Sequence, residues 1–289
     1  MTIVVTGATG HLGRLVVESL LERGVPAAEI RALGRSAERL TPLKARGVET
    51  RVIDFEQPET LIPAFAGADV LLLVSGSEVG KRMPQHANAI RAAVDAGVGR
   101  IVYTSAPHAD DSDLVLAPEH KQTEALLAES GLPVTILRNN WYTENYAGQL
   151  DTASATGEIV ASVGDGRVAS ATRADYAEAA AVVLSTDGHE GAVYELSGDT
   201  AWTFDELATI VGELVGRDVA YRAVSPEEHG RILTEAGLDA GTAGFVVALD
   251  GNIRDGALAD ATDTLSGLIG RPTTPLRDGL AAALPAQAA

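Results

Sequence analysis

Three glycines at a spacing of three residues, Gly7, Gly10 and Gly13, follow a short apolar stretch at the start of the chain. The first lets the chain turn tightly, the second lets backbone amides approach a pyrophosphate, and the third lets a helix pack closely on a sheet. The N-terminus of that helix adds free N–H groups and a partial positive charge. We therefore predict a phosphate cradle for a dinucleotide, with a simple strand-to-helix turn as the alternative. Its members are Gly7, Ala8, Thr9, Gly10, His11, Leu12 and Gly13.

Arg35 stands where NAD and NADP are told apart, after the second expected strand. An acid at that place would hold the ribose 2′-hydroxyl, but residues 34–36 read Gly-Arg-Ser. The planar guanidinium of an arginine makes bidentate, charge-assisted bonds to a 2′-phosphate. We therefore predict NADP(H) as the cofactor, and an ordinary solvated arginine is the alternative.

Further candidates stand in loops that follow the later expected strands. Asp54 and Phe55 are placed to contact the adenine, and residues 75–77, small and polar, suit the ribose and nicotinamide. Residues 138–146 combine amides with aromatic rings, which suits a planar, oxygen-bearing ligand, although a hinge between two lobes is an alternative. The candidates in these loops are Asp54, Phe55, Ser75, Gly76, Ser77, Asn139, Asn140, Trp141, Tyr142, Thr143 and Glu144.

Alternating apolar and amphipathic segments must position these loops. The expected strands are residues 2–6, 29–33, 49–53, 69–74, 100–105 and 133–137, and the expected helices include 58–66, 84–96 and 118–130. This order predicts an α/β fold, a Rossmann-type doubly wound parallel sheet. Ligands of such sheets bind beyond the carboxyl ends of the strands.

The regular alternation of expected strands and helices ends near residue 150. We predict an NADP-binding Rossmann domain over residues 1–150, to which residues 170–187 return, and a smaller, mostly helical substrate-binding lobe over residues 151–289. Within that lobe, residues 157–160 and the Gly-Asp-Gly turn at 164–166 predict a hairpin. Thr203 and Ser225, each followed three residues later by glutamate, predict capping boxes.

Composition narrows the classes of partner. The chain has 289 residues, no cysteine and a formal net charge of −18. The missing cysteines exclude disulfides and thiolate ligands, no metal-ligand spacing is found, and so acidic a chain repels nucleic acids and anionic membranes. No apolar run is long enough to cross a bilayer, and we expect a cytoplasmic protein. Since NADPH is itself a polyanion, its site needs local donors and positive charge.

Three stretches together resemble one family. They are residues 72–80 (Leu-Leu-Val-Ser-Gly-Ser-Glu-Val-Gly), 140–146 (Asn-Trp-Tyr-Thr-Glu-Asn-Tyr) and 169–176 (Ala-Ser-Ala-Thr-Arg-Ala-Asp-Tyr). Each resembles the type 2 NAD(P)H:quinone oxidoreductases, which are NmrA-like atypical short-chain dehydrogenases, and the similarity extends over nearly the whole chain. The resemblance implies direct hydride transfer from NADPH to a quinone without flavin or metal. It also implies that residues 7–12, Arg35, residues 75–77, residues 139–144 and Arg173 line the site.

The wider superfamily reduces ketones with a Tyr-x-x-x-Lys pair that protonates the new alkoxide. In this chain His120 falls at the lysine position, Leu116 at the tyrosine position, and Lys121 is one place away, about 100° around a helix. A quinone tolerates that loss, because its reduced anion is delocalised and water can protonate it. Our hypothesis is that His120 or Tyr142 donates to a quinone oxygen; for His120 the alternative is a histidine on the helix surface.

Other functions stay open at this stage. A non-catalytic NADP(H)-binding redox sensor of the NmrA type would also lack the Tyr/Lys pair. Reduction of triphenylmethane or azo dyes is a third reading, because these substrates are planar electrophiles too. Sugar-nucleotide epimerisation is disfavoured by the missing pair and the short C-terminal lobe. The expected partner is a small quinone-like molecule, and a homodimer is the candidate assembly.

Overall fold

The computed structural model describes residues 1–76, 78 and 80–283. The chain divides into two compact units, the first built from residues 1–110, 116–139 and 173–196 and the second from residues 111–115, 140–172 and 197–289. The first unit therefore ends its main run at Asn139, the last residue of a strand, before the predicted boundary at residue 150.

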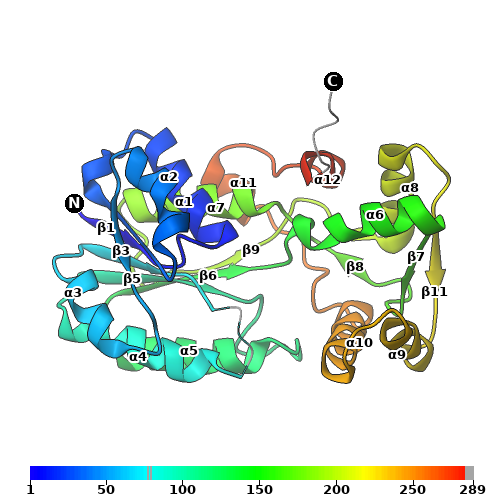
Figure 1. The fold of residues 1–289 in the computed structure, drawn as a ribbon, viewed down its shortest axis with the longest axis horizontal. Helices are drawn as coiled ribbons and strands as arrows, with labels where there is room; N and C mark the ends of the chain where they lie inside the picture. The colour runs from blue at the N-terminus through cyan, green and yellow to red at the C-terminus, as the bar shows by residue number, and fades with distance from the viewer. Residues whose placement is uncertain (77, 79, 284–289) are drawn as a thin grey trace. The chain divides into compact units, whose positions relative to one another are not determined.

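The first unit contains a sheet with helices on both faces, as Figure 1 shows. Its strands are β1 (Ile3–Val5), β2 (Ile30–Gly34), β3 (Glu49–Val52), β4 (Val70–Leu73), β5 (Arg100–Ser105), β6 (Val134–Asn139) and β9 (Val193–Leu196). Its helices are α1 (His11–Glu22), α2 (Ala37–Ala45), α3 (Leu61–Phe65), α4 (Arg82–Asp95), α5 (Ala117–Glu129) and α7 (Arg173–Ser185), with short 3₁₀ turns η1 (Ala27–Glu29) and η2 (Pro58–Thr60). Helices α1, α2 and α7 lie on one face, and α3, α4 and α5 lie on the other (Figure 1).

The strand order is β3-β2-β1-β4-β5-β6-β9, and every neighbouring pair is parallel. The chain moves outward from β1 to β3 and then returns to the other side of β1 with β4, so the order reverses between β1 and β4. In open parallel sheets a ligand binds beyond the carboxyl ends of the strands at such a switch point. The glycine-rich segment directly follows β1 and lies at this point.

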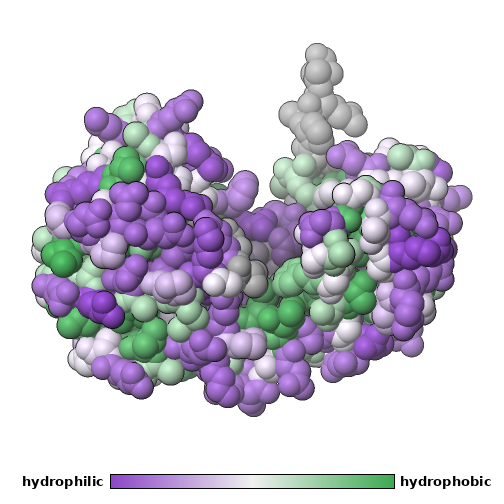
Figure 2. Space-filling model, turned by 60° about the horizontal axis from the view of Figure 1, so that its bottom comes forward, coloured by the Kyte–Doolittle hydropathy of each residue, from purple (hydrophilic) through white to green (hydrophobic). Residues whose placement is uncertain are grey.

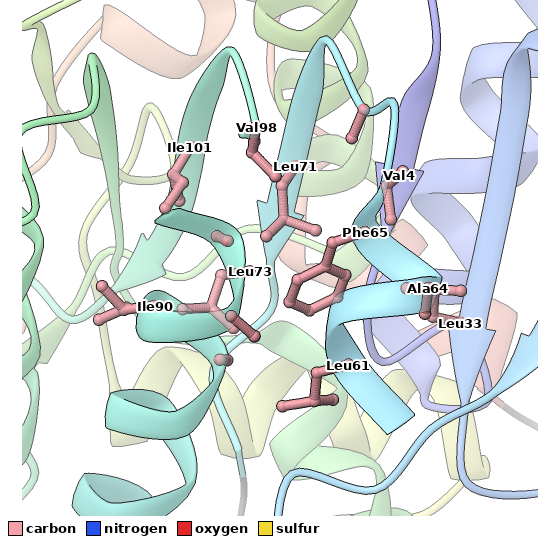
Figure 3. Close-up of a cluster of buried hydrophobic side chains, with 14 of the residues drawn as sticks. Val4, Leu33, Leu61, Ala64, Phe65, Leu71, Leu73, Ile90, Val98 and Ile101 are labelled. Atoms are coloured by element: carbon pink, nitrogen blue, oxygen red, sulfur yellow. The ribbon is translucent and has the colours of Figure 1, made fainter. Parts of the chain in front are cut away.

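The core under the switch point consists mainly of apolar side chains from the sheet and from the helices α3 and α4 (Figure 3). Val4 on β1 and Leu71 on β4 are fully buried beside Phe65 of α3, and α4 adds Ile90. Such strands, buried on both faces, are expected to read as continuous apolar runs. The six expected strands agree with the observed ones to within two residues at each end, and β9 was not expected.

The opposite face of the sheet is covered by α1 and α7, which pack closely together. Helix α1 buries Val16, Val17 and Leu20, and α7 contributes a run of buried alanines around Ala180. Small side chains on α7 let the two backbones approach closely, since packed helices lie 8–10 Å apart depending on the side chains between them.

The second unit is mostly helical. Its helices are α6 (Ala147–Thr156), α8 (Phe204–Val215), α9 (Pro226–Glu235), α10 (Ala240–Arg254), α11 (Thr264–Ile269) and α12 (Leu276–Ala283), and a 3₁₀ turn, η3 (Thr143–Tyr146), precedes them. Its strands are β7 (Glu158–Ala161), β8 (Arg167–Val168), β10 (Trp202–Thr203) and β11 (Ala220–Ala223). The capping box predicted at Thr203 is present, with both reciprocal bonds to Glu206. At Ser225 the side chain accepts a hydrogen bond from the Glu228 amide.

The predicted hairpin at residues 157–166 is wrong. Strand β7 pairs in parallel with β11, and β8 pairs antiparallel with β10, so the two strands do not pair with each other. The chain between them is held elsewhere: the amide and hydroxyl of Ser162 both donate to Asp250, at 2.6 and 2.9 Å. A Cβ on Gly166 would approach the Ile253 carbonyl carbon to 2.8 Å. The glycine turn therefore packs on α10 and does not reverse a strand.

Hydrophilic residues cover most of the molecular face drawn in Figure 2, with hydrophobic residues in smaller patches. A chain with a formal net charge of −18 is expected to have such a surface. Among the helices of residues 1–283 that the structure describes, none combines the length and the apolar character needed to span a bilayer.

Candidate functional site

The glycine turn after β1 is fixed by one backbone hydrogen bond to β2 and one within the turn itself. Gly7 has a left-handed φ of +63°, a conformation that favours glycine. The Ala8 amide donates to the Leu33 carbonyl on β2 at 2.8 Å, and the Gly10 amide donates back to the Gly7 carbonyl at 2.8 Å. A Cβ on Gly13 would lie 2.6 Å from the Gly7 carbonyl carbon and 2.9 Å from the Thr6 oxygen. Helix α1 therefore approaches the turn as closely as its backbone allows.

The first turn of α1 keeps its amides available for an anion. Its N-cap, Gly10, is extended and makes no side-chain cap bond, and no acidic residue occupies the first turn. His11 is exposed there, whereas Ala8 and Leu12 are buried and pack into the fold. Thr9 lies against Gly34, where a Cβ would meet the Thr9 hydroxyl at 2.7 Å. A helix N-terminus with free N–H groups and a positive dipole end suits a phosphate.

Arg35 follows β2 directly, and 68% of its side chain is exposed. Its Nη1 lies 2.6 Å from Oε1 of Glu78, in the loop after β4. The hydrogen bond from Arg35 lowers the pKa of Glu78 below its ordinary value. Ser36, the residue after Arg35, caps α2 by accepting from the Arg39 amide at 3.3 Å, and a hydroxyl that accepts one hydrogen bond still has a proton to donate.

The loop after β3 is held by its own polar groups. Asp54 accepts from the Glu56 amide at 2.9 Å, and the Thr60 hydroxyl contacts both the amide and the carbonyl of Asp54. The Phe55 carbonyl accepts from the Asn88 side chain of α4 at 2.9 Å. The backbone at both candidate residues is thus fixed beyond the end of β3, where the adenine contact is predicted.

The loop after β4 is gripped by two side chains of α4. The Ser75 amide donates to Thr104 on β5 at 2.9 Å. The Gly76 amide donates to Nε2 of His86 at 3.1 Å, and Nε of Arg82 donates to the Gly76 carbonyl at 3.0 Å. The N–H and the C=O of Gly76 are therefore both hydrogen-bonded to side chains of α4. Ser77, the third candidate of this loop, lies outside the described residues.

Those two side chains are held in turn by α5. Nη1 of Arg82 lies 2.8 Å from Glu119, and Nδ1 of His86 lies 3.0 Å from the Thr123 hydroxyl, which donates to the Glu119 carbonyl. Because Nε2 of His86 must accept from an amide, we assign its proton to Nδ1. Burial lowers the pKa of His86 to about 3, so the ring is neutral near pH 7. Sequence reasoning missed these residues, although the i, i+4 pairs 82/86 and 119/123 are a usable signal.

His120 lies in the interior, so the surface alternative is wrong. Only 5% of the residue is exposed, and its Nδ1 lies 2.8 Å from the hydroxyl of Tyr103 on β5. Burial, with the nearby Arg82 charge, lowers the pKa of His120 to about 3. Burial raises the pKa of Tyr103 above its ordinary value, so this phenol is a poor proton donor. A neutral His120 that accepts a hydrogen bond from the Tyr103 hydroxyl at Nδ1 carries its own proton on Nε2. The Tyr103 partner was not anticipated from the sequence.

A guanidinium with three carboxylate partners lies at the end of β6. Arg138 contacts Glu124 at 2.7 Å, Asp110 at 2.7 Å and Glu195 at 2.9 Å. Ser105, the last residue of β5, donates to Glu124 at 2.5 Å. The hydrogen bond from Arg138 lowers the pKa of Asp110 below its ordinary value. This network ties the ends of β5, β6 and β9 together.

The remaining candidates divide between the two units. Asn139 ends β6, and Arg173 begins α7, both in the first unit. Residues 140–144 belong to the second unit, where Tyr142 forms a parallel bridge with Ala171 and the Thr143 hydroxyl lies 2.9 Å from that of Ser170. Asn140 and Thr143 are buried, and Trp141, Tyr142 and Glu144 are partly buried. The two residues predicted to donate to a quinone oxygen, His120 and Tyr142, thus lie in different units.

A parallel sheet with its switch point at β1 and β4, and a glycine cradle at the N-terminus of α1, define a dinucleotide-binding protein of the Rossmann type. The family model for NAD(P)H-binding proteins matches residues 7–187, and the chain belongs to this family.

Individual relatives refine this assignment. The chain is 47% identical over 278 residues to Quinone oxidoreductase 2 of Escherichia coli (strain K12), with 96% of this chain and 97% of that protein covered. The crystal structure of NADPH-dependent quinone oxidoreductase QOR2 from E. coli complexed with NADPH matches with a TM-score of 0.94 at 46% identity, covering 97% of this chain and 99% of that chain. Triphenylmethane reductase from Citrobacter sp. complexed with NADP(H) matches with a TM-score of 0.93 at 41% identity, covering 98% and 100%. The resemblance to type 2 quinone oxidoreductases and the predicted fold class are confirmed.

Proposed function

We propose that this protein is an NADPH-dependent reductase that transfers hydride directly to a quinone or a similar planar electrophile. The observation that carries the proposal is the uncapped, acid-free N-terminus of α1 beside the Gly7 turn, followed by Arg35 in place of an acid at the end of β2. The 47% identity to Quinone oxidoreductase 2 over almost the whole chain supports the reductase activity and the quinone.

The residues present fit a 2′-phosphorylated dinucleotide. A Cβ on Gly13 would meet the backbone of Gly7 and Thr6, so glycine lets α1 start close to the turn. The N-terminus of α1, which has no side-chain cap and no acidic residue in its first turn, would bind the pyrophosphate through its backbone amides. Arg35 is exposed enough to turn its guanidinium to a 2′-phosphate. Asp54, Phe55, Ser75, Gly76, Asn139 and Arg173 complete the cofactor contacts that we propose for the first unit. Residues 140–144, which belong to the second unit, are proposed as cofactor contacts on the resemblance of the sequence alone.

NADPH, when bound, supplies the hydride, and the protein supplies orientation. Positioning a planar acceptor is worth several orders of magnitude in rate when the reacting atoms are held close. The hydrogen bonds from Arg82 and to His86 hold the backbone of Gly76, one of the proposed cofactor contacts, in place. His120 assists by donating a hydrogen bond from its neutral Nε2–H; since its pKa is about 3, it gives up no proton near pH 7. Water protonates the reduced quinone, and Tyr142 is the second donor that we propose.

The proposal is tested by following NADPH absorbance while the protein is mixed with a benzoquinone. Enzyme-dependent oxidation is expected, and its absence across several quinones would favour a non-catalytic NADP(H) sensor. The cofactor assignment is tested by titrating NADPH and NADH against the wild type, Arg35→Ala and Arg46→Ala. Arg46 is a matched control because it is an exposed arginine on the far end of α2. Arg35→Ala should lose the preference for NADPH, whereas Arg46→Ala should keep it.

Reduction of triphenylmethane dyes is a second candidate, favoured by the likeness to the Citrobacter enzyme. Both substrate classes are planar electrophiles, so kcat/KM for a benzoquinone and for a triphenylmethane dye should be compared on one preparation. A clear excess for the dye would assign that class as the substrate.

We further propose a cytoplasmic protein that acts on small molecules and binds no nucleic acid. The net charge of −18 supports this, because phosphate backbones are repelled. A homodimer is the assembly that we propose, and light scattering on the purified protein tests it.

A further inference from the structure

Glu78 places a carboxylate beside the guanidinium that is assigned to the 2′-phosphate. Its Oε1 lies 2.6 Å from Nη1 of Arg35, and its Oε2 lies 3.7 Å from Nζ of Lys81. Lys81 is shared with Glu56, 3.4 Å away. Each oxygen of Glu78 thus faces a cation, which is the arrangement that a bound phosphate oxygen pair would have.

The loop that bears Glu78 is anchored on both sides. On one side, Gly76 is held by Arg82 and His86, both at least nine-tenths buried. On the other side, the Gly80 amide donates to Glu119 at 2.9 Å. Because Arg82 also pairs with Glu119, both anchors rest on α5. The two described neighbours of Glu78, Gly76 and Gly80, are therefore both held by side chains, and the Glu78 carboxylate lies within hydrogen-bond distance of Arg35.

We propose that Glu78 determines cofactor specificity by competing with the 2′-phosphate for Arg35. This inference rests on the proposed function, because it assumes that Arg35 binds the phosphate. The phosphate carries close to two negative charges, so it displaces the Glu78 carboxylate from the Arg35 guanidinium when the cofactor binds. The competition lowers the affinity for both NADPH and NADP⁺, and it leaves NADH unaffected because NADH makes no demand on Arg35.

The expected effect is modest and specific. An exposed ion pair of this kind is weak, so Glu78→Gln should tighten NADPH binding about two- to fivefold and leave the Kd of NADH unchanged. Glu38→Gln is the matched control: Glu38 is an exposed acid in the first turn of α2, three residues from Arg35, and it makes no ion pair within the described residues. It removes the same charge and should leave both Kd values unchanged.

The test is a binding cycle by calorimetry at low, fixed ionic strength, with NADPH and NADH as ligands. The proteins are the wild type, Glu78→Gln, Arg35→Ala, Arg35→Ala/Glu78→Gln and Glu38→Gln. Tighter NADPH binding by Glu78→Gln alone, with no gain in the Arg35→Ala background, supports the competition. Unchanged or weaker NADPH binding by Glu78→Gln overturns it, since Glu78 would then be neutral or would orient Arg35 for the phosphate. An equal gain in Glu38→Gln also overturns it, because net charge alone would explain the effect.

The two proposals fail in different ways. If Arg35→Ala loses NADPH preference but Glu78→Gln changes nothing, the specificity role of Glu78 is wrong and the cofactor site stands. If Arg35→Ala keeps the full preference for NADPH, the cofactor site is misassigned and the competition falls with it.

Discussion

Gly13→Ala is the substitution that most directly tests the geometry of the cofactor cradle. The added Cβ would lie 2.6 Å from the Gly7 carbonyl carbon and 2.9 Å from the Thr6 oxygen, and closer still to the Gly7 oxygen. All three atoms belong to the backbone, so no side-chain rotation relieves the contact. Helix α1 must move by about 1 Å to restore an ordinary separation.

The cost follows from what α1 touches. It packs closely on α7 and buries Val16, Val17 and Leu20, so a shift disturbs both the helix pair and the turn. Overpacking of this kind costs about 1–3 kcal/mol. Alanine in a helix gains roughly 0.5–1 kcal/mol over glycine, which offsets only part of the cost. We expect a net loss of about 1–2 kcal/mol in the free energy of unfolding, together with weaker NADPH binding.

Gly244→Ala is the matched control. Gly244 lies inside α10 with nothing within 4 Å of its added Cβ, so the same chemical change should stabilise the protein by roughly 0.5–1 kcal/mol. Urea unfolding and calorimetric titration with NADPH measure both variants. A Gly13→Ala protein as stable as Gly244→Ala, with unchanged NADPH affinity, would refute the close approach of α1 to the Gly7 turn.

Three further predictions concern the groups around the strand ends. Burial lowers the pKa of His86 from 6.5 to about 3 in the folded protein. The stability that the neutral His86 ring contributes is therefore complete above pH 6.5 and is lost as the pH falls toward 3. Urea unfolding of His86→Gln between pH 7 and 5 should show a shallower loss of stability than the wild type. Arg138→Met leaves the carboxylate of Glu124, with 14% of its side chain exposed, without its partner, and should lower the free energy of unfolding by about 3 kcal/mol at pH 7. That loss should shrink when the carboxylate is removed together with the guanidinium, in Arg138→Met/Glu124→Gln, and an equal loss in the single and double variants would contradict the charge explanation. His120→Phe and Tyr142→Phe should each reduce quinone turnover modestly, and loss of all activity in either would show that a proton donor is essential.

The sheet and the cradle could be predicted because their signals are local. The two central strands, β1 and β4, are unbroken apolar runs, and the glycines that follow β1 have fixed spacing and chain position. The position of Arg35 after β2 follows from the same order. The residues that hold the loop after β4, Arg82 and His86, are visible in the sequence. Their role depends on α4 and α5 lying side by side, and no local pattern shows that arrangement.

The burial of His120 illustrates what periodicity does not reveal. Helix α5 buries Ala117, His120, Thr123 and Leu127, a face in which two of the four residues are polar. The sequence of α5 therefore shows no row of apolar residues that would predict this buried face. The polar groups are satisfied by Tyr103 and His86 from other elements, and these partners come together only in the folded unit.

The hairpin prediction failed for a related reason. Glycine turns between short apolar segments commonly reverse a strand, but here the chain around Ser162 bonds to Asp250, far along the sequence. Strand β7 finds its partner in β11, across the intervening helices. The turn itself was predicted correctly, since Gly164 has a positive φ of 56°. The strands beside it nevertheless pair with distant segments and not with each other.

Because residues 173–196 belong to the first unit, that unit cannot be completed until they have been synthesised. When β6 emerges from the ribosome, its outer edge has no partner and α1 has no α7 beside it, because both arrive later in the chain. At about 5–20 residues per second this interval lasts roughly 3–11 s. An unpaired strand edge is a template for aggregation, so the nascent chain is most vulnerable then. A fragment cut near residue 150 would keep that vulnerability permanently.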